Sequence, residues 1–264
     1  MSEPLPSTSQ HVTTFGTWTL FVKEVRRFMK VLVQTVATPV ITALLYLLVF
    51  SHVMSDRIEV YPGVAYTAFL IPGLIMMSVI QNAFANTSSS MIQSKIMGHI
   101  VLLLMTPLSG FNIFVAYVGA AVLRAVLVSI GLFLLALFFV RLEVQAPLML
   151  IAMLLLSSAS LAVLGLIAGI IADKFEHLSA FQNFFIMPAS FLSGVFYSIH
   201  SLPGIWRMLS HYNPFFYMID GFRYGFFGVG DADPLLSVAV VSGFLLAVSM
   251  LCLVMLKRGY KLRP

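Results

Sequence analysis

The stretch "LMLIAMLLLSSASLAVLGLIAGIIA", at residues 148–172, decides the fold class of this chain. It contains no charged residue and is longer than the about 20 apolar residues that a helix needs to cross a bilayer. Lipid offers no hydrogen-bond partner to a free backbone group, so the stretch must be helical. Gly165 and Gly169 lie four residues apart in it, and this spacing of small residues predicts close approach by a neighbouring helix.

The rest of the chain shares this character. Of its 264 residues, 60% are hydrophobic and 9% are charged, whereas a soluble domain has about 25% charged residues. The apolar runs are uninterrupted, unlike the segments of about ten alternating residues in a membrane β-barrel. An all-α membrane protein is therefore expected. Its six predicted transmembrane helices cover residues 31–53, 64–85, 113–140, 148–172, 178–197 and 235–256.

Lysine and arginine predict the orientation, because cytoplasmic loops carry an excess of these residues. With both termini inside, the cytoplasmic segments hold ten of the 15 Lys and Arg residues, and the outer segments hold four. The prediction is an N-in, C-in bundle. The same asymmetry explains the net charge of +5, so no nucleic-acid partner is expected.

The segment before the first predicted span has an amphipathic pattern. Residues 14–30, "TFGTWTLFVKEVRRFMK", place apolar side chains at helical spacing and charged side chains around the other side. This pattern is typical of a helix in the interface plane, although a simple cytoplasmic anchor for the first span is the alternative. Residues 1–13 are predicted to be a flexible cytoplasmic tail, and residues 257–264 a basic one.

The segment between the second and third spans, residues 86–110, lies on the predicted cytoplasmic side. Its apolar part, "IVLLLM", is too short to cross a membrane. We expect a short helix docked under the bundle, with Lys95, Met97, Gly98 and His99 at an exposed turn. Packing on the chain's own helices, without any partner, is the alternative.

The outer segment between the fifth and sixth spans, residues 197–234, contains "HYNPFFYMIDGFRYGFFG" at residues 211–228. This stretch is too polar for a plain span and too aromatic for a solvated loop. Aromatic rings suit the half-wet membrane interface, so a periplasmic re-entrant or interfacial helical segment is predicted. Asp220 and Arg223, three positions apart, are expected to pair and so reduce the cost of shallow burial.

Polar residues inside the predicted spans are candidates for function. Arg124 could line a cavity, pair with an acid or reach the cytoplasmic interface. Gln81, Asn82 and Asn86 end the second span, where they could join helices by hydrogen bonds or line a path. No acidic residue lies deep in any span, which argues against an ion-coupled carrier.

The sequence contains no catalytic pattern. The H-E-x-x-H and G-x-S-x-G patterns are absent, and the lone Cys252 has no partner for a disulfide. No catalytic residue, metal ligand or cofactor site is expected in this chain. The G-x-x-x-x-G-K-[ST] phosphate loop is also absent, so any ATP that drives the protein must bind a second protein.

Two stretches resemble a known family. "FLIPGLIMMSVIQNAFAN" (residues 69–86) and "FLSGVFYSIHSLPGIWRMLSHYNPFFYMIDGFRYGFFG" (residues 191–228) are similar to segments of type-2 ABC exporter permeases. The resemblance covers about Phe21 to Leu262. It implies that residues 14–30 rest on an ATPase and that about Ser90–Thr106 form the coupling helix.

The resemblance also implies roles for single residues. Contact with the ATPase is implied for Glu24, Arg26, Arg27, Lys95, Met97, Gly98 and His99. The implied lining of the cargo path is Met76, Asn82 and Asn86 from the second span, and Phe181, Phe185 and Met187 from the fifth. We further expect a periplasmic gate at Asn213, Pro214, Tyr217, Asp220 and Arg223.

These features predict a permease subunit in a bacterial inner membrane that exports an amphipathic or hydrophobic cargo, such as a drug, a lipid or a lipid-linked glycan, by alternating access. The implied partners are membrane lipid, a second copy of the permease and two copies of a cognate ATPase, which would bind ATP and Mg²⁺. The alternatives are a carrier or channel that works without ATP, and a membrane scaffold that transports nothing.

Overall fold

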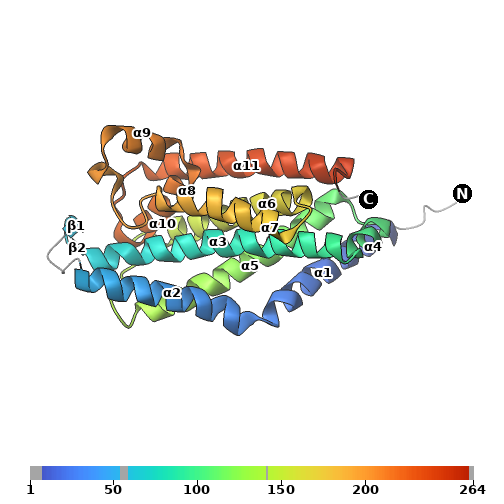
Figure 1. Cartoon of the computed structure of the whole chain (residues 1–264), viewed down its shortest axis with the longest axis horizontal. Helices are drawn as coiled ribbons and strands as arrows, with labels where there is room; N and C mark the ends of the chain where they lie inside the picture. Colours follow the sequence, from blue (N-terminus) through green and yellow to red (C-terminus); the bar gives the residue numbers. More distant parts are fainter. Residues whose placement is uncertain (1–7, 54–58, 141, 262–264) are drawn as a thin grey trace, which may run out of the picture.

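The computed structural model describes residues 8–53, 59–140 and 142–261, which are almost entirely helical (Figure 1). In chain order the elements are α1 (Thr8–Met29), α2 (Leu32–Val53), β1 (Glu59–Tyr61), β2 (Val64–Ala65), α3 (Tyr66–Ile96), α4 (His99–Met105), α5 (Gly110–Ala136), α6 (Pro147–Ile171), α7 (Phe175–Phe181), the π-helical η1 (Gln182–Ile186), α8 (Met187–Phe191), the 3₁₀-helical η2 (Ile199–Ser201), α9 (Gly204–Tyr212), α10 (Pro214–Phe227) and α11 (Pro234–Arg258). The helical fold class is confirmed. Five of these helices are long and apolar enough to cross a membrane, namely α2, α3, α5, α6 and α11.

Most of the long helices run along the length of the molecule, and the hairpin, α4 and α9 lie toward its two ends (Figure 1). The β1–β2 hairpin and α9 lie at one end. The start of α1, the short α4 and the end of α11 lie at the other. Both ends of the described chain therefore emerge at the same end of the bundle, as an N-in, C-in arrangement requires.

The centre of the bundle is the contact between α3 and α6. A Cβ atom at Gly165 would collide with the backbone carbonyl of Phe84, and one at Gly169 would lie 2.7 Å from Cβ of Met91. The close approach predicted from the glycine spacing is therefore confirmed. The hydroxyl of Thr87 adds a hydrogen bond across the contact, donating to the carbonyl oxygen of Ala162 over 2.6 Å.

Helix α3 extends well beyond the predicted second span, which ends at residue 85. The polar run after this point stays helical to Ile96. Its hydroxyls bond to carbonyls of the preceding turn, as Ser89 does to Ala85 over 2.5 Å, or to neighbouring helices. Such bonds let serine and threonine remain inside a helix, so the polar run does not mark the end of the helix.

The fifth predicted span, residues 178–197, differs most from expectation. It is a helical rod from Phe175 to Phe191, made of α7, η1 and α8, and turns follow from residue 192. Pro188 has no N–H and its ring crowds the carbonyl four residues earlier, which accounts for the wider π-helical turn directly before it. The rod is therefore not among the five long apolar helices.

The remaining boundaries shift by a few residues. Helix α1 begins at Thr8 instead of residue 14, so part of the predicted flexible tail is helical, and residues 1–7 lie outside the described part. Helix α11 continues to Arg258, into the predicted basic tail, of which residues 262–264 also lie outside it. The β1–β2 hairpin is an addition to the predicted elements.

Candidate functional site

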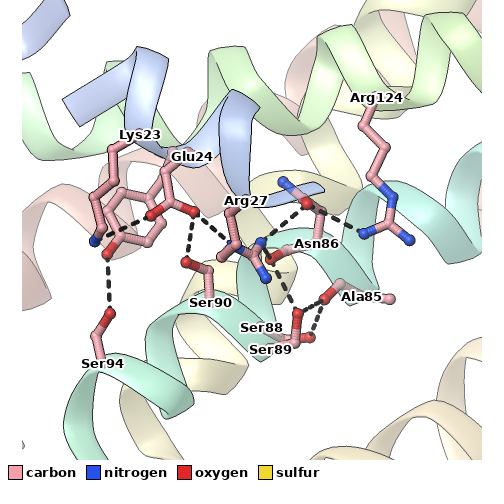
Figure 2. A network of polar contacts seen from close by, with 11 residues as sticks. Lys23, Glu24, Arg27, Ala85, Asn86, Ser88, Ser89, Ser90, Ser94 and Arg124 are labelled. Atoms are coloured by element: carbon pink, nitrogen blue, oxygen red, sulfur yellow. Dashed lines mark hydrogen bonds and ion pairs between the residues drawn. The ribbon is translucent and has the colours of Figure 1, made fainter. Parts of the chain in front are cut away.

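A cluster of polar side chains joins α1, α3 and α5 (Figure 2). Its carboxylate is Glu24, whose side chain is only 1% exposed. One oxygen of Glu24 accepts hydrogen bonds from Nε of Arg27 over 3.1 Å and from the hydroxyl of Ser90 over 2.5 Å. The other oxygen lies 3.4 Å from Nζ of Lys23. A buried carboxylate is stable only with such partners, and these come from α1 itself and from the polar run of α3.

Asn86 is the centre of this cluster. Arg27 donates to its backbone oxygen over 2.8 Å and to its Oδ1 over 3.0 Å. Arg124 donates to the same Oδ1 over 3.2 Å and to Oδ1 of Asn82 over 3.1 Å. The interhelical hydrogen bonds considered for these two asparagines are therefore present. Asn86 thus joins one arginine from α1 to one from α5.

The buried face of α1 matches only part of the predicted apolar stripe, whose members are Trp18, Phe21, Val22, Val25 and Phe28 or Met29. Leu20, Glu24 and Phe28, at intervals of four residues, face the bundle, whereas Trp18 is 61% exposed. The pairing of Glu24 with Arg27 and Ser90 is what allows this face to be buried. Of the three α1 residues implied to contact an ATPase, only Arg26 is exposed, and the side chains of Glu24 and Arg27 are bonded inside the bundle.

The turn between α3 and α4 is exposed, as predicted. Met97, Gly98 and His99 all face solvent. Gly98 has φ 72°, in the left-handed region that favours glycine, so it reverses the chain between the two helices. Apolar side chains surround the turn and are themselves exposed, among them Ile96, Met97, Leu102 and Met105.

Lys95, also predicted to lie in this turn, instead closes the end of α6. Its ammonium group donates to the carbonyl oxygens of Ile170 and Ala172 over 2.8 and 2.6 Å. A cation at the carbonyl end of a helix opposes the negative end of the helix dipole. Lys95 therefore connects α3 to α6 and is not available to a partner in this arrangement.

Asp173, beside this contact, connects the C-terminal segment to the bundle. Nζ of Lys261 lies 3.2 Å from one of its carboxylate oxygens, and Nζ of Lys95 lies 3.6 Å from the other. The hydrogen bond from Lys261 and the two nearby positive charges hold the pKa of Asp173 below its usual value. The predicted cytoplasmic end therefore carries a charge cluster that links α3, α6 and the segment after α11.

A groove of about 450 Å³ opens between α2, α3, Arg124 of α5 and the η1–α8 part of the broken rod. Polar side chains line it at Gln34, Thr35, Thr38, Thr42, Ser78, Gln81, Asn82 and Gln182. Arg124 is the one charged residue among the described residues that line it. Of the three alternatives for Arg124, the structure shows cavity lining.

The groove contains two of the six residues implied to line a cargo path, Asn82 and Met187. The other four lie elsewhere: Met76 is fully buried in the core, Asn86 binds the two arginines behind the groove, Phe181 stacks on Phe84 with ring centres 5.4 Å apart, and Phe185 is 64% exposed. The polar stripe of α2 is absent from the predicted lining. Its signal is visible in the sequence, because Gln34, Thr35, Thr38 and Thr42 recur at helical spacing in an otherwise apolar run.

The predicted gate lies at the opposite end of the bundle, where α10 is folded back between α3, α6 and α11 (Figure 1). The predicted pairing of Asp220 with Arg223 is wrong: the salt bridges among the described residues do not include it. Asp220 accepts hydrogen bonds from the backbone N–H groups of Asp231 and Ala232 over 2.8 and 2.9 Å. Arg223 donates to the carbonyl of Gly194 over 2.8 Å.

Each side chain binds backbone groups of a different turn, although Nε of Arg223 is buried and has no hydrogen-bond partner among the described residues. Arg223 also lies 3.7 Å above the ring of Phe69, a cation–π contact that favours a buried guanidinium. Asp220 and Arg223 are each 1% exposed. Their role in this structure is to hold two turns on α10.

Asp231 is the central residue of this end, although no sequence pattern marks it. Its side chain is 1% exposed and accepts hydrogen bonds from the hydroxyls of Tyr61 and Ser198 over 2.9 and 2.8 Å and from the N–H of Ile199 over 2.9 Å. Burial raises the pKa of Tyr61, so this hydroxyl stays protonated and donates. Asp231 thus joins the hairpin before α3 to the turn after α8. We call Asp220, Arg223 and Asp231 the outer cap.

The other predicted gate residues shape the start of α10. Asn213 accepts a hydrogen bond from the N–H of Phe215 and donates to the carbonyl of Ala189 over 2.8 Å, which makes it an N-cap that also holds α8. Pro214 occupies the first turn, where no N–H is needed. The Tyr217 hydroxyl donates to the carbonyl of His211 over 3.1 Å. All three therefore stabilise the fold of this end.

Comparison with known proteins shows which family the chain is similar to. A family model described as ABC-2 type transporter matches residues 16–227. The chain is 39% identical over 244 residues to the inner membrane transport permease YadH of Escherichia coli K12, covering 92% of this chain and 95% of that protein. It is 24% identical over 208 residues to nodulation protein J of Rhizobium leguminosarum bv. viciae, covering 78% and 79%.

Proposed function

The chain belongs to the ABC-2 type transporter family as a multi-pass inner-membrane permease subunit, and from this premise we propose that it exports an amphipathic cargo with energy supplied by a separate ATPase. The observation that supports this most strongly is the exposed turn at Met97–His99, which follows α3, a helix that lines the groove, and is surrounded by exposed apolar side chains. Exposed apolar patches mark contact with a partner protein or with the membrane, and in this proposal the contact is with the ATPase.

The proposed topology has six spans with both termini in the cytoplasm. The five long helices supply five spans, and the rod from Phe175 to Phe191 supplies the sixth. At 1.5 Å per residue the rod is shorter than a full hydrocarbon layer, and the turns that follow it are covered by α9 and α10 on the periplasmic side. The turn at Met97–His99 and the start of α1 are then cytoplasmic.

The proposed assembly pairs two copies of this permease above two ATPase subunits, which bind ATP and Mg²⁺. The family implies an ATPase partner. The surface that suits it comprises Arg26, Met97, Gly98, His99 and the exposed apolar residues of α4. Glu24, Arg27 and Lys95, which the resemblance placed in this contact, act in the proposal by transmitting movement inside the permease.

Alternating access follows from the hydrogen bonds that join these helices. ATP-driven closure of the ATPase pair displaces the α3–α4 turn and α1. Because Arg27 and Arg124 share Asn86, movement of α1 reaches the lining of the groove. The outer cap keeps the periplasmic end closed until the helices tilt, since Asp231 joins segments from three parts of the chain.

The test is transport by the full-length permease with its ATPase in proteoliposomes. Replacing Met97–His99 by Gly-Ser-Gly should abolish cargo-dependent ATP hydrolysis while the permease remains folded. The matched control replaces three exposed residues of α9, Ile205–Arg207, by the same sequence at the opposite end of the bundle, and coupling should persist. Unchanged coupling in the first variant would contradict the assignment of the turn. Transport by the permease alone, driven by an ion gradient, would favour a carrier. The absence of transport under every condition would favour a scaffold.

A further inference from the structure

Among the described residues, Arg124 is a cation without a counter-ion in the wall of the groove. Its guanidinium donates only to neutral amide oxygens, those of Asn82 and Asn86. Its Nε is buried and has no hydrogen-bond partner in the part of the chain that the structure describes. Within residues 8–53, 59–140 and 142–261 no acid forms a salt bridge with it, because Glu24, the acid of the same cluster, binds Arg27 and Lys23.

This arrangement is costly unless a ligand completes it. Arg27 and Arg124 bind the same oxygen of Asn86, so two positive charges are held close together and one carboxylate serves the first of them. A charge at membrane depth normally pairs with another charge or faces a water-filled cavity. The groove supplies the cavity and leaves one positive charge facing it.

The rest of the lining indicates the chemistry of the occupant. Hydroxyl and amide groups from α2 and α3 surround the guanidinium, and apolar side chains such as Leu74, Met77 and Met187 line the same groove. A guanidinium matches phosphate and carboxylate oxygens in geometry and charge. A ligand with an anionic head and an alkyl tail satisfies both parts of the wall, whereas a purely apolar ligand leaves the polar groups unpaired.

We propose that Arg124 binds the anionic head of an amphiphilic cargo, with Asn82 and Asn86 as positioning residues that hold the guanidinium against the groove. The inference rests on the proposed function, since it takes the groove to be the cargo path. It narrows the cargo to amphiphiles that carry a phosphate or a similar oxyanion.

The test measures binding of a fluorescent dodecyl phosphate, and of its neutral dimethyl ester, to the purified full-length permease in a neutral detergent. The wild type should bind the phosphate about tenfold more tightly than the ester. Arg124→Gln should abolish this preference, and Arg124→Lys should retain part of it because the charge remains. Arg207→Gln, which removes an exposed arginine at the outer end, should bind as the wild type does.

A photoactivatable version of the same phosphate tests the position of binding. Cross-links should map to the lining segments of α2 and α3, around Thr35–Thr42 and Ser78–Asn82. Equal binding of phosphate and ester by the wild type would overturn the proposal, even if Arg124→Gln fails to fold. So would cross-links confined to other surfaces, or full displacement of the probe by inorganic phosphate alone, which would assign the site to a free anion.

This experiment is independent of the ATPase. A preference for phosphate in the isolated permease, combined with no ATP-driven transport, would support the anion site and contradict export. Transport of neutral amphiphiles by a permease that shows no preference would support export and contradict the anion site.

Discussion

Arg27 of α1 and Arg124 of α5 donate hydrogen bonds to the same atom, Oδ1 of Asn86, over 3.0 and 3.2 Å. One neutral oxygen thus holds two guanidinium groups that would otherwise repel each other. The carboxylate of Glu24 balances the charge of Arg27, and the guanidinium of Arg124 faces the groove. This relationship joins the helix that is expected to rest on an ATPase to the surface that is expected to meet cargo.

Asn86→Ala should lower the free energy of unfolding by about 3 kcal/mol, because both arginines lose an acceptor inside the bundle. Asn82→Ala removes one acceptor from Arg124 alone and should cost about half as much. Thermal unfolding of the two purified variants in the same detergent measures the difference. Equal losses of unfolding free energy would show that the oxygen shared by the two arginines contributes no more to stability than the oxygen of Asn82.

Gly165→Ala should separate α3 from α6, since the new Cβ would collide with the carbonyl of Phe84. The expected cost is about 2–3 kcal/mol, as for other overpacked contacts. Gly243→Ala in α11 is the control, because a Cβ at this position would meet no atom within 4 Å, and it should leave the melting temperature unchanged or raise it slightly. A stable Gly165→Ala protein would contradict the close contact between the two helices.

Asp231→Ala should open the outer cap. It removes the acceptor of Tyr61, Ser198 and the N–H of Ile199, so a loss of about 3 kcal/mol is expected, together with faster proteolysis at the hairpin. Asp233→Ala is the matched control: Asp233 is exposed and caps α11 through the N–H groups of Leu235 and Leu236, a contact worth about 1 kcal/mol. If the two variants were cleaved at the same rate, the cap would not depend on Asp231.

Asp173→Asn should destabilise the protein in a way that depends on pH. The pKa of Asp173 is lower in the folded chain than its usual value of 3.8, chiefly through the hydrogen bond from Lys261. A carboxyl whose folded pKa is depressed stabilises the fold above its unfolded pKa and loses that effect as pH falls through the folded pKa. Wild type and variant should therefore differ in melting temperature at neutral pH and converge as the pH falls below 3.8 and through the lower pKa of the folded protein. A difference in melting temperature that persists in acid would show that the substitution acts through packing or hydrogen bonding and not through the lost charge.

The sequence predicts the spans better than it predicts their ends. Apolar runs locate α2, α3, α5, α6 and α11, because burial in lipid demands long uninterrupted helices. The polar run after Asn86 suggests a loop, but hydroxyls that bond to their own helix and to α1 keep it helical. Pro188 is visible in the sequence, yet the π-helical turn before it, in the rod from Phe175 to Phe191, is seen only in the structure.

The candidate sites show the same division. The exposure of the turn at Met97–His99 is predicted correctly because Gly98 and His99 break the apolar pattern locally, between the polar run of α3 and the short apolar run that follows. Asp231 escapes prediction because its three partners are more than 30 residues away in the chain, and no local pattern marks such a residue. The pairing of Asp220 with Arg223 is wrong because helical spacing brings them near each other, while the turns that satisfy them approach only in the folded protein.

The sequence by itself determined that this protein is a helical membrane protein and which family it resembles, because hydrophobic length and local motifs are properties of contiguous residues. Only the tertiary structure decided which polar residues bind each other and which remain free. Hydrogen bonds and charge pairs depend on distances between segments far apart in the chain. That is why Glu24, predicted to face an ATPase, is buried with Arg27, and why Arg124 is the charge that faces the groove.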